Sequence, residues 1–226
     1  MNLLLIALAP VLIIAVYIYF RDKYEKEPIG LLLLSLLAGA LVVIPVLIVE
    51  SLLTQINPFS SNIPNAAYNA FVVAGFTEEF FKWLAIVVLL LRNKNFDQYF
   101  DGIVYAVFVS LGFAAIENVF YVVDGGLSVG ALRAFTAVPL HTMTGIYMGF
   151  YFSMAKFSGQ NRTLFFLQAL LIPLVFHGFY DFFLMTKQIV FLLAWAPFFI
   201  WLIIRSFRKM KKLSIITSQQ QEINDI

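Results

Sequence analysis

Residues 31–54 read LLLLSLLAGALVVIPVLIVESLLT, a run in which Glu50 is the only charged side chain. A helix needs about 20 predominantly apolar residues to cross the roughly 30 Å of hydrocarbon in a bilayer. The run therefore predicts a helix that spans a membrane, with Glu50 at the interface near its end.

Apolar runs of similar length continue on both sides of this one. The chain of 226 residues is 62% hydrophobic and 12% charged, with a mean hydropathy of +0.89. Soluble domains have about 45–50% apolar and about 25% charged residues. Strands of a membrane β-barrel would alternate in segments of roughly 10 residues, which these runs do not do. We predict an all-α, polytopic transmembrane helical bundle of about seven spans, the last of them short, near 2–20, 31–54, 66–91, 102–123, 134–155, 164–185 and 189–204.

The basic residues predict how the bundle is oriented. Segments 21–30, 92–101, 156–163 and 205–226 carry 12 Lys and Arg residues, whereas the N-terminus and segments 55–65, 124–133 and 186–188 carry 2. By the positive-inside rule, the N-terminus lies outside and the C-terminus is cytoplasmic. The first run has its basic residues after it and none before it, so an uncleaved first span is favoured over a signal peptide. We expect a membrane domain over 1–212 and a short, polar, disordered cytoplasmic tail over 213–226.

Composition also excludes some functions. The chain has no cysteine, which removes disulfides, thiol nucleophiles and thiolate metal sites. The net charge of +2 is small, so nucleic-acid binding has little support.

Ionisable residues lie inside four of the predicted spans. A charged residue costs about 2.5–3.5 kcal/mol at a helix centre, so such residues usually face a cavity or a partner. In the predicted topology most of them lie roughly 8–14 Å below the outer surface, at 1.5 Å per residue. Because four helices bring polar groups to overlapping depths, we predict that they form one site. Its members are Glu78, Glu79 and Lys82, then Glu117, then His141, then His177 and Asp181.

Helical spacing adds local detail. Glu78 and Lys82 are one turn apart, as are His177 and Asp181. The first pair suits either charge neutralisation or a role in the site. The second suits a carboxylate that orients an imidazole, or two metal ligands. Gly145 and Gly149 form a GxxxG pattern, which favours a close helix contact.

These side chains favour hydrolysis by activated water. A carboxylate in a partly desolvated site can act as a general base, and imidazoles can bind an oxyanion or protonate a leaving amine. A metal site would use His141, His177 and an acid, although the HExxH motif of many zinc proteases is absent. Serine catalysis is less attractive, because the nearest serine, Ser110, lies two turns from Glu117.

At these positions the sequence resembles the PrsW family of bacterial intramembrane proteases, within the wider group of type II CAAX prenyl proteases and bacteriocin-processing enzymes. The resemblance covers about residues 10–210 and is carried by GFTEEFFKW (75–83), DGIVYAVFVSLGFAAIENVFY (101–121), RAFTAVPLHTMTGIYMGFY (133–151) and FHGFYDFF (176–183). Glu117 and Asp181 depart from the wider group, which often has His and Asn there.

The resemblance implies a multi-pass protease of the bacterial cell membrane. Its expected substrate is a single-span membrane protein, an anti-sigma factor, that is cut at site 1 on the extracytoplasmic side. We expect Glu78 to be the base, assisted by Glu79, with His141 and His177 positioning water and oxyanion. No cofactor is expected, and a divalent metal such as zinc stays open. The alternatives are a proton- or cation-coupled transporter that uses the Glu/His cluster as a relay, and a non-catalytic scaffold or immunity factor.

Overall fold

The computed structural model describes residues 3–90 and 93–224, and within these ranges it contains helices and connecting turns but no strand. The predicted all-α class is therefore confirmed. The helices are α1 (Leu3–Arg21), α2 (Ile29–Leu41), α3 (Val43–Gln55), α4 (Asn62–Tyr68), the π-helix η1 (Asn69–Phe76), α5 (Thr77–Leu90), α6 (Asp101–Phe135), α7 (Ala137–Phe157), α8 (Arg162–Met185) and α9 (Ile189–Asn224).

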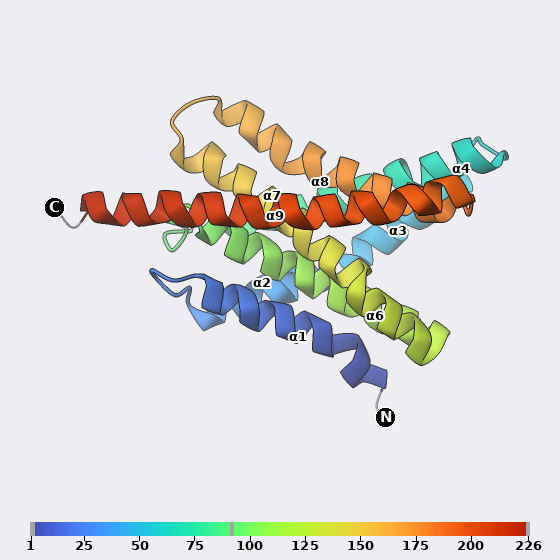
Figure 1. The fold of residues 1–226 in the computed structure, drawn as a ribbon, viewed down its shortest axis with the longest axis horizontal. Coiled ribbons are helices and arrows are strands. Elements are labelled where there is room, and N and C mark those ends of the chain that lie inside the picture. Colours follow the sequence, from blue (N-terminus) through green and yellow to red (C-terminus); the bar gives the residue numbers. More distant parts are fainter. Residues whose placement is uncertain (1–2, 91–92, 225–226) are drawn as a thin grey trace.

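The long helices run roughly along one axis, and the two chain termini lie at opposite ends of the bundle (Figure 1). The α1–α2 and α7–α8 connections lie towards the end that holds the C-terminus. Helix α4 and the last part of α6 lie towards the other end. The basic and non-basic connections of the sequence are thus separated onto opposite ends, as expected for a chain that crosses a membrane repeatedly.

Helix α6 is the central helix of the bundle. Every residue from Asp101 to Ala114 is buried, and α1, α2 and α7 all pack against this helix. The closest approach to α7 uses glycine. A Cβ on Gly149 would lie 2.1 Å from the backbone oxygen of Gly102, so no larger residue fits there. The GxxxG pattern at 145–149 is confirmed as a helix contact.

The outer surface of the bundle is apolar. Large side chains such as Ile13, Leu33, Ile48 and Val190 are more than half exposed. Exposed apolar area on this scale would be a liability in water but suits a lipid surround. Among the residues that the structure describes, five stretches are long and apolar enough to cross a membrane: Leu4–Arg21, Ile29–Gln55, Asp101–Phe157, Arg162–Met185 and Ile189–Glu222.

Several elements differ from the predicted spans. The 31–54 span is broken at Val42, three residues before Pro45, whose ring nitrogen cannot donate a helical hydrogen bond. The 66–91 span is made of α4, η1 and α5. Stretch Asp101–Phe157 contains two predicted spans, joined by further helix rather than by a loop. The count of seven spans therefore stays a prediction.

The tail also differs from the sequence-based prediction. Helix α9 continues to Asn224, so most of 213–226 is helical and the predicted disorder is wrong there. Met210, Leu213 and Thr217 recur on one helix face and are all buried. The Thr217 hydroxyl accepts a hydrogen bond from the backbone N–H of Phe100, 3.1 Å away, which fixes this face against the rest of the chain.

Candidate active site

The first layer of the site is an ion triad on α5. The Lys82 ammonium donates hydrogen bonds to Glu78 Oε2 at 3.1 Å and to Glu79 Oε1 at 2.9 Å. The three residues fall within little more than one helical turn, so the chain itself places them together. The π-helix η1 lies directly before this turn. Such segments are frequent at functional sites.

His141 joins α7 to this triad. Its Nδ1 lies 3.0 Å from Lys82 Nζ, and its Nε2 lies 2.8 Å from Glu117 Oε2. An ammonium group has donors but no acceptor, so Nδ1 must accept and the ring proton must sit on Nε2, where it is donated to Glu117. The contacts thus assign His141 as the neutral Nε2–H tautomer.

His177 of α8 has carboxylates on both sides of its ring. Its Nδ1 lies 2.8 Å from Glu79 Oε1, and its Nε2 lies 3.3 Å from Asp181 Oδ2 and 3.8 Å from Glu78 Oε2. Because each neighbouring oxygen is an acceptor, both ring nitrogens are best satisfied as donors, which is the imidazolium form. The rings of His141 and His177 are 5.3 Å apart, centroid to centroid.

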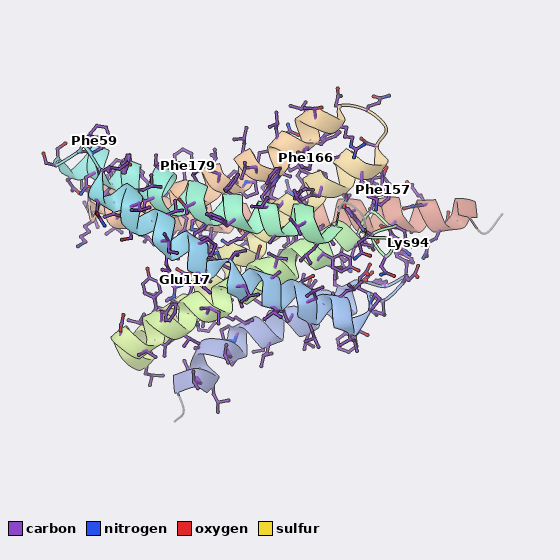
Figure 2. All side chains as sticks on the ribbon, turned by 180° about the vertical axis from the view of Figure 1, so that it is seen from behind. Phe59, Lys94, Glu117, Phe157, Phe166 and Phe179 are labelled. Atoms are coloured by element: carbon purple, nitrogen blue, oxygen red, sulfur yellow. The ribbon has the colours of Figure 1, made fainter. Side chains whose placement is uncertain are left out.

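All seven residues predicted to form one site are thus brought together. We refer to Glu78, Glu79, Lys82, Glu117, His141, His177 and Asp181 as the site cluster. In Figure 2, Glu117 lies in the half of the bundle that ends near Phe59, whereas Lys94 and Phe157 mark the opposite end. Glu117 therefore lies nearer to the Phe59 end of the bundle than to the end at Lys94 and Phe157.

A cavity of about 660 Å³ opens onto the site cluster. Five members of the cluster line it: Glu78, Glu117, His141, His177 and Asp181. Glu79 and Lys82 do not line it, and their side chains are fully buried behind the wall. The structure therefore separates the two neighbouring glutamates, because Glu78 faces the cavity and Glu79 supports the groups around it.

Arg133 is a site residue that sequence reasoning missed. Its Nη2 lies 2.8 Å from Glu117 Oε2, its Nε donates to Asn118 Oδ1 at 3.0 Å, and its guanidinium stacks on the Tyr121 ring. The backbone leaves helical geometry at Gly126, where φ is 73°, and the segment after it returns Arg133 to the cavity wall. One feature of the sequence could have pointed to Arg133: it is the only basic residue of segment 124–133.

Glu50 also lines the cavity, together with polar residues of α4 and η1. The sequence placed Glu50 at the interface and outside the site. The wall beside it carries the amides of Asn65 and Asn69, which are hydrogen-bonded to each other. Their sequence carried no helical pattern that tied them to the acidic and histidine residues, so they were not predicted.

The donor set resembles a metal site in its chemistry. Glu78, Glu79, His141 and His177 each offer one ligand atom, and these atoms lie within 4.8 Å of one another. Carboxylate and imidazole ligands suit zinc. The space between Glu78, Glu79 and His141, however, is filled by Lys82 Nζ, which is hydrogen-bonded to all three. A metal ion does not fit beside this ammonium group.

Comparison with known proteins identifies close relatives. A family model described as PrsW family intramembrane metalloprotease matches residues 27–204. Protease PrsW of Shouchella clausii is 36% identical over 216 residues, which cover 96% of this chain and 99% of that protein. Protease PrsW of Bacillus subtilis is 31% identical (92% and 95% covered), and that of Clostridioides difficile is 38% identical (83% and 81%). No solved structure matches the chain.

Proposed function

Because the chain belongs to the PrsW family of intramembrane proteases, we propose that this peptidase cuts a single-span membrane protein, of the anti-sigma-factor type, on the extracytoplasmic side of the bacterial cell membrane. The proposed reaction is peptide hydrolysis by water that Glu78 activates. The single observation that carries the proposal is that Glu78 lines the cavity, whereas its hydrogen-bond partner Lys82 does not and is fully buried.

The geometry supports a defined role for each group. Glu78 takes a proton from a cavity water, and the resulting hydroxide forms a C–O bond with the substrate carbonyl carbon. His177 Nε2, 3.8 Å from Glu78 Oε2 on the same wall, donates to the oxyanion that develops. The C–N bond then breaks, and the proton held by Glu78 passes to the leaving amine.

The remaining members of the cluster hold these two groups in place. Glu79 Oε1 accepts from both Lys82 and His177, so it fixes the distance between the base and the imidazolium. Asp181 Oδ2 lies 3.3 Å from His177 Nε2, so its charge favours the imidazolium form, whose Nε2–H is donated to the oxyanion when substrate is bound. Glu117 Oε2 accepts from His141 Nε2. Such preorganised donors and acceptors supply much of the catalytic effect in buried sites.

We further propose that the chain crosses the membrane seven times, with the N-terminus outside and the C-terminus in the cytoplasm. The opposite placement of the termini supports an odd number of crossings. If Asp101–Phe157 counts as two crossings, the five apolar stretches give six, and the 62–90 segment supplies one more. Several of its polar residues, among them Asn65, Asn69 and Glu78, line the cavity. In this orientation the site cluster lies in the outer half of the bilayer.

The proposed mechanism is tested with purified protein and a tagged single-span substrate in vesicles. We expect Glu78→Gln to lower kcat by about a thousandfold or more, since it removes the general base. Glu222→Gln, a matched change on the exposed tail helix, should cleave like wild type.

Mapping of the products by mass spectrometry gives the cleaved bond. We expect it at the extracytoplasmic end of the substrate's span. Undiminished cleavage by Glu78→Gln would overturn the assignment of the base, and a cut at the cytoplasmic end would overturn the orientation. The family assignment favours proteolysis over the transporter and scaffold alternatives.

A further inference from the structure

Lys82 is a fully buried charge that lies behind the cavity wall. Its side chain is 0% exposed, and its Nζ is surrounded by Glu78 Oε2 at 3.1 Å, Glu79 Oε1 at 2.9 Å and His141 Nδ1 at 3.0 Å. An ammonium group has three protons, and each has one acceptor here. The hydrogen-bonding capacity of Lys82 is therefore fully used within the cluster.

Two carboxylate oxygens and an imidazole nitrogen around one cation are the ligand types of a zinc site. The same three residues, together with His177, form the one group among the described residues whose donor atoms lie close enough together for a metal ion. Lys82 Nζ thus occupies the place of a cation, and its hydrogen bonds use one oxygen of each carboxylate and the Nδ1 lone pair of His141.

The ammonium group and a divalent ion cannot share this place. Both are positive, and in a buried site their repulsion is screened far less than in water. Lys82 also has no path to solvent, because its whole side chain is buried and its Nζ lies 4.2 Å from the centre of the Phe113 ring. A metal ion could bind between these residues only if the Lys82 side chain lost its charge or moved away.

We propose that the Lys82 ammonium is the resident cation of the active site, so that the enzyme holds no metal there, and that removal of Lys82 converts the site into a zinc site. This departs from the word metalloprotease in the description of the matching family. The inference concerns the cation and not the reaction; it rests on the proposed function only in treating these residues as the active site.

The ammonium group would perform two of the tasks that a metal performs elsewhere. It pairs with both Glu78 and Glu79 and offsets part of their negative charge, which lowers the cost of burying two carboxylates at adjacent positions. It also fixes the His141 tautomer, because Nδ1 must accept from it. It cannot act as a Lewis acid on a carbonyl, so activation of water is left to a carboxylate.

The test measures zinc binding rather than cleavage. Wild type, Lys82→Ala, the double variant Lys82→Ala/His141→Ala and the exposed-loop control Lys94→Ala are purified in detergent, equilibrated with zinc sulfate and desalted. Bound zinc is then measured by elemental analysis. We expect Lys82→Ala to retain about one zinc ion per chain, and the other three proteins to retain essentially none. Wild-type cleavage should be unchanged by a chelator.

Each outcome bears on the proposal separately from proteolysis. A wild-type protein that retains about one zinc ion, and loses it in Glu79→Gln or His141→Ala, would overturn it. So would a folded Lys82→Ala variant, with a wild-type circular dichroism spectrum, that retains none. If Lys82→Ala does not fold, the wild-type measurement still decides whether the site holds a metal. Failure to find any cleaved substrate affects the proposed function and leaves the zinc result standing.

Discussion

Arg133 connects the site cluster to the segment that turns back at Gly126. It pairs with Glu117, which in turn accepts from His141, so a continuous line of polar contacts runs from Arg133 to Lys82. Arg133 does not touch Glu78 in this line, and we treat it as a positioning residue. Its guanidinium holds the Glu117 carboxylate in place as the acceptor for His141.

We expect Arg133→Gln to lower kcat about ten- to a hundredfold, since loss of a charged hydrogen bond in a buried site costs about 1–3 kcal/mol. Arg133→Lys should recover part of the rate, because it keeps the charge but loses the fork that reaches both Glu117 and Asn118. Steady-state kinetics check this, and a purely structural role would leave kcat unchanged while lowering only thermal stability. A rate for Arg133→Gln within twofold of wild type would contradict the positioning role.

At this scale, the sequence predicted which types of residue gather but not how they pair. Lys82 with Glu78, and His177 with Asp181, follow from helical spacing alone. The contacts of His141 with Lys82, and of His177 with Glu79, join residues that are far apart in the chain. They depend on the rotation of each helix about its axis. Hydropathy does not determine that rotation when the whole helix is apolar, which is why Glu50 was missed. Arg133 was missed because it belongs to a predicted connection, which returns to the cavity after the kink at Gly126.

Among the elements, the α6–α7 pair determines where the second half of the site lies. His141 and Glu117 face each other because the two helices approach closely near Gly102 and Gly149.

We expect Gly149→Ala to destabilise the protein by about 1–3 kcal/mol, since its Cβ would meet backbone atoms that cannot give way. Gly30→Ala is the matched control, because a Cβ there meets nothing within 4 Å. Thermal unfolding in detergent checks both, and equal melting temperatures would contradict the close packing.

The existence of most helices could be predicted, whereas their interruptions could not. A proline breaks a helix only where its missing donor is not compensated, and Pro10, Pro173 and Pro197 all lie inside continuous helices. The break at Val42 therefore needed the structure. The π-helix η1 has no signature in hydropathy, because its residues are as apolar as those of its neighbours. The helical part of the tail was missed because its buried face consists of only a few residues, spaced among many polar ones.

At the scale of the whole molecule, acidic side chains gather at the end of the bundle opposite the cavity. Asp22 and Glu27 lie in the connection between α1 and α2, and both are almost fully buried. Burial raises the pKa of Asp22 from 3.8 to about 6 and that of Glu27 from 4.5 to about 7, although the Tyr105 hydroxyl donates to Glu27 and opposes the rise. This connection is therefore held most strongly when its carboxyl groups carry protons.

The sign of the resulting pH dependence follows from linkage. A carboxyl group whose pKa is higher in the folded state than in the unfolded state binds its proton more tightly when folded. Its contribution to stability is complete below the unfolded pKa of about 4.5 for Glu27 and is lost as the pH rises towards the folded pKa of about 7.

We expect the free energy of unfolding to fall as the pH rises across this window, and Glu27→Gln to remove part of the fall. Glu222→Gln, on the exposed end of α9, should leave the pH dependence unchanged. Unfolding measured from pH 4 to pH 8 checks the difference between the two variants, and parallel curves for wild type and Glu27→Gln would show that Glu27 does not gain its proton on folding.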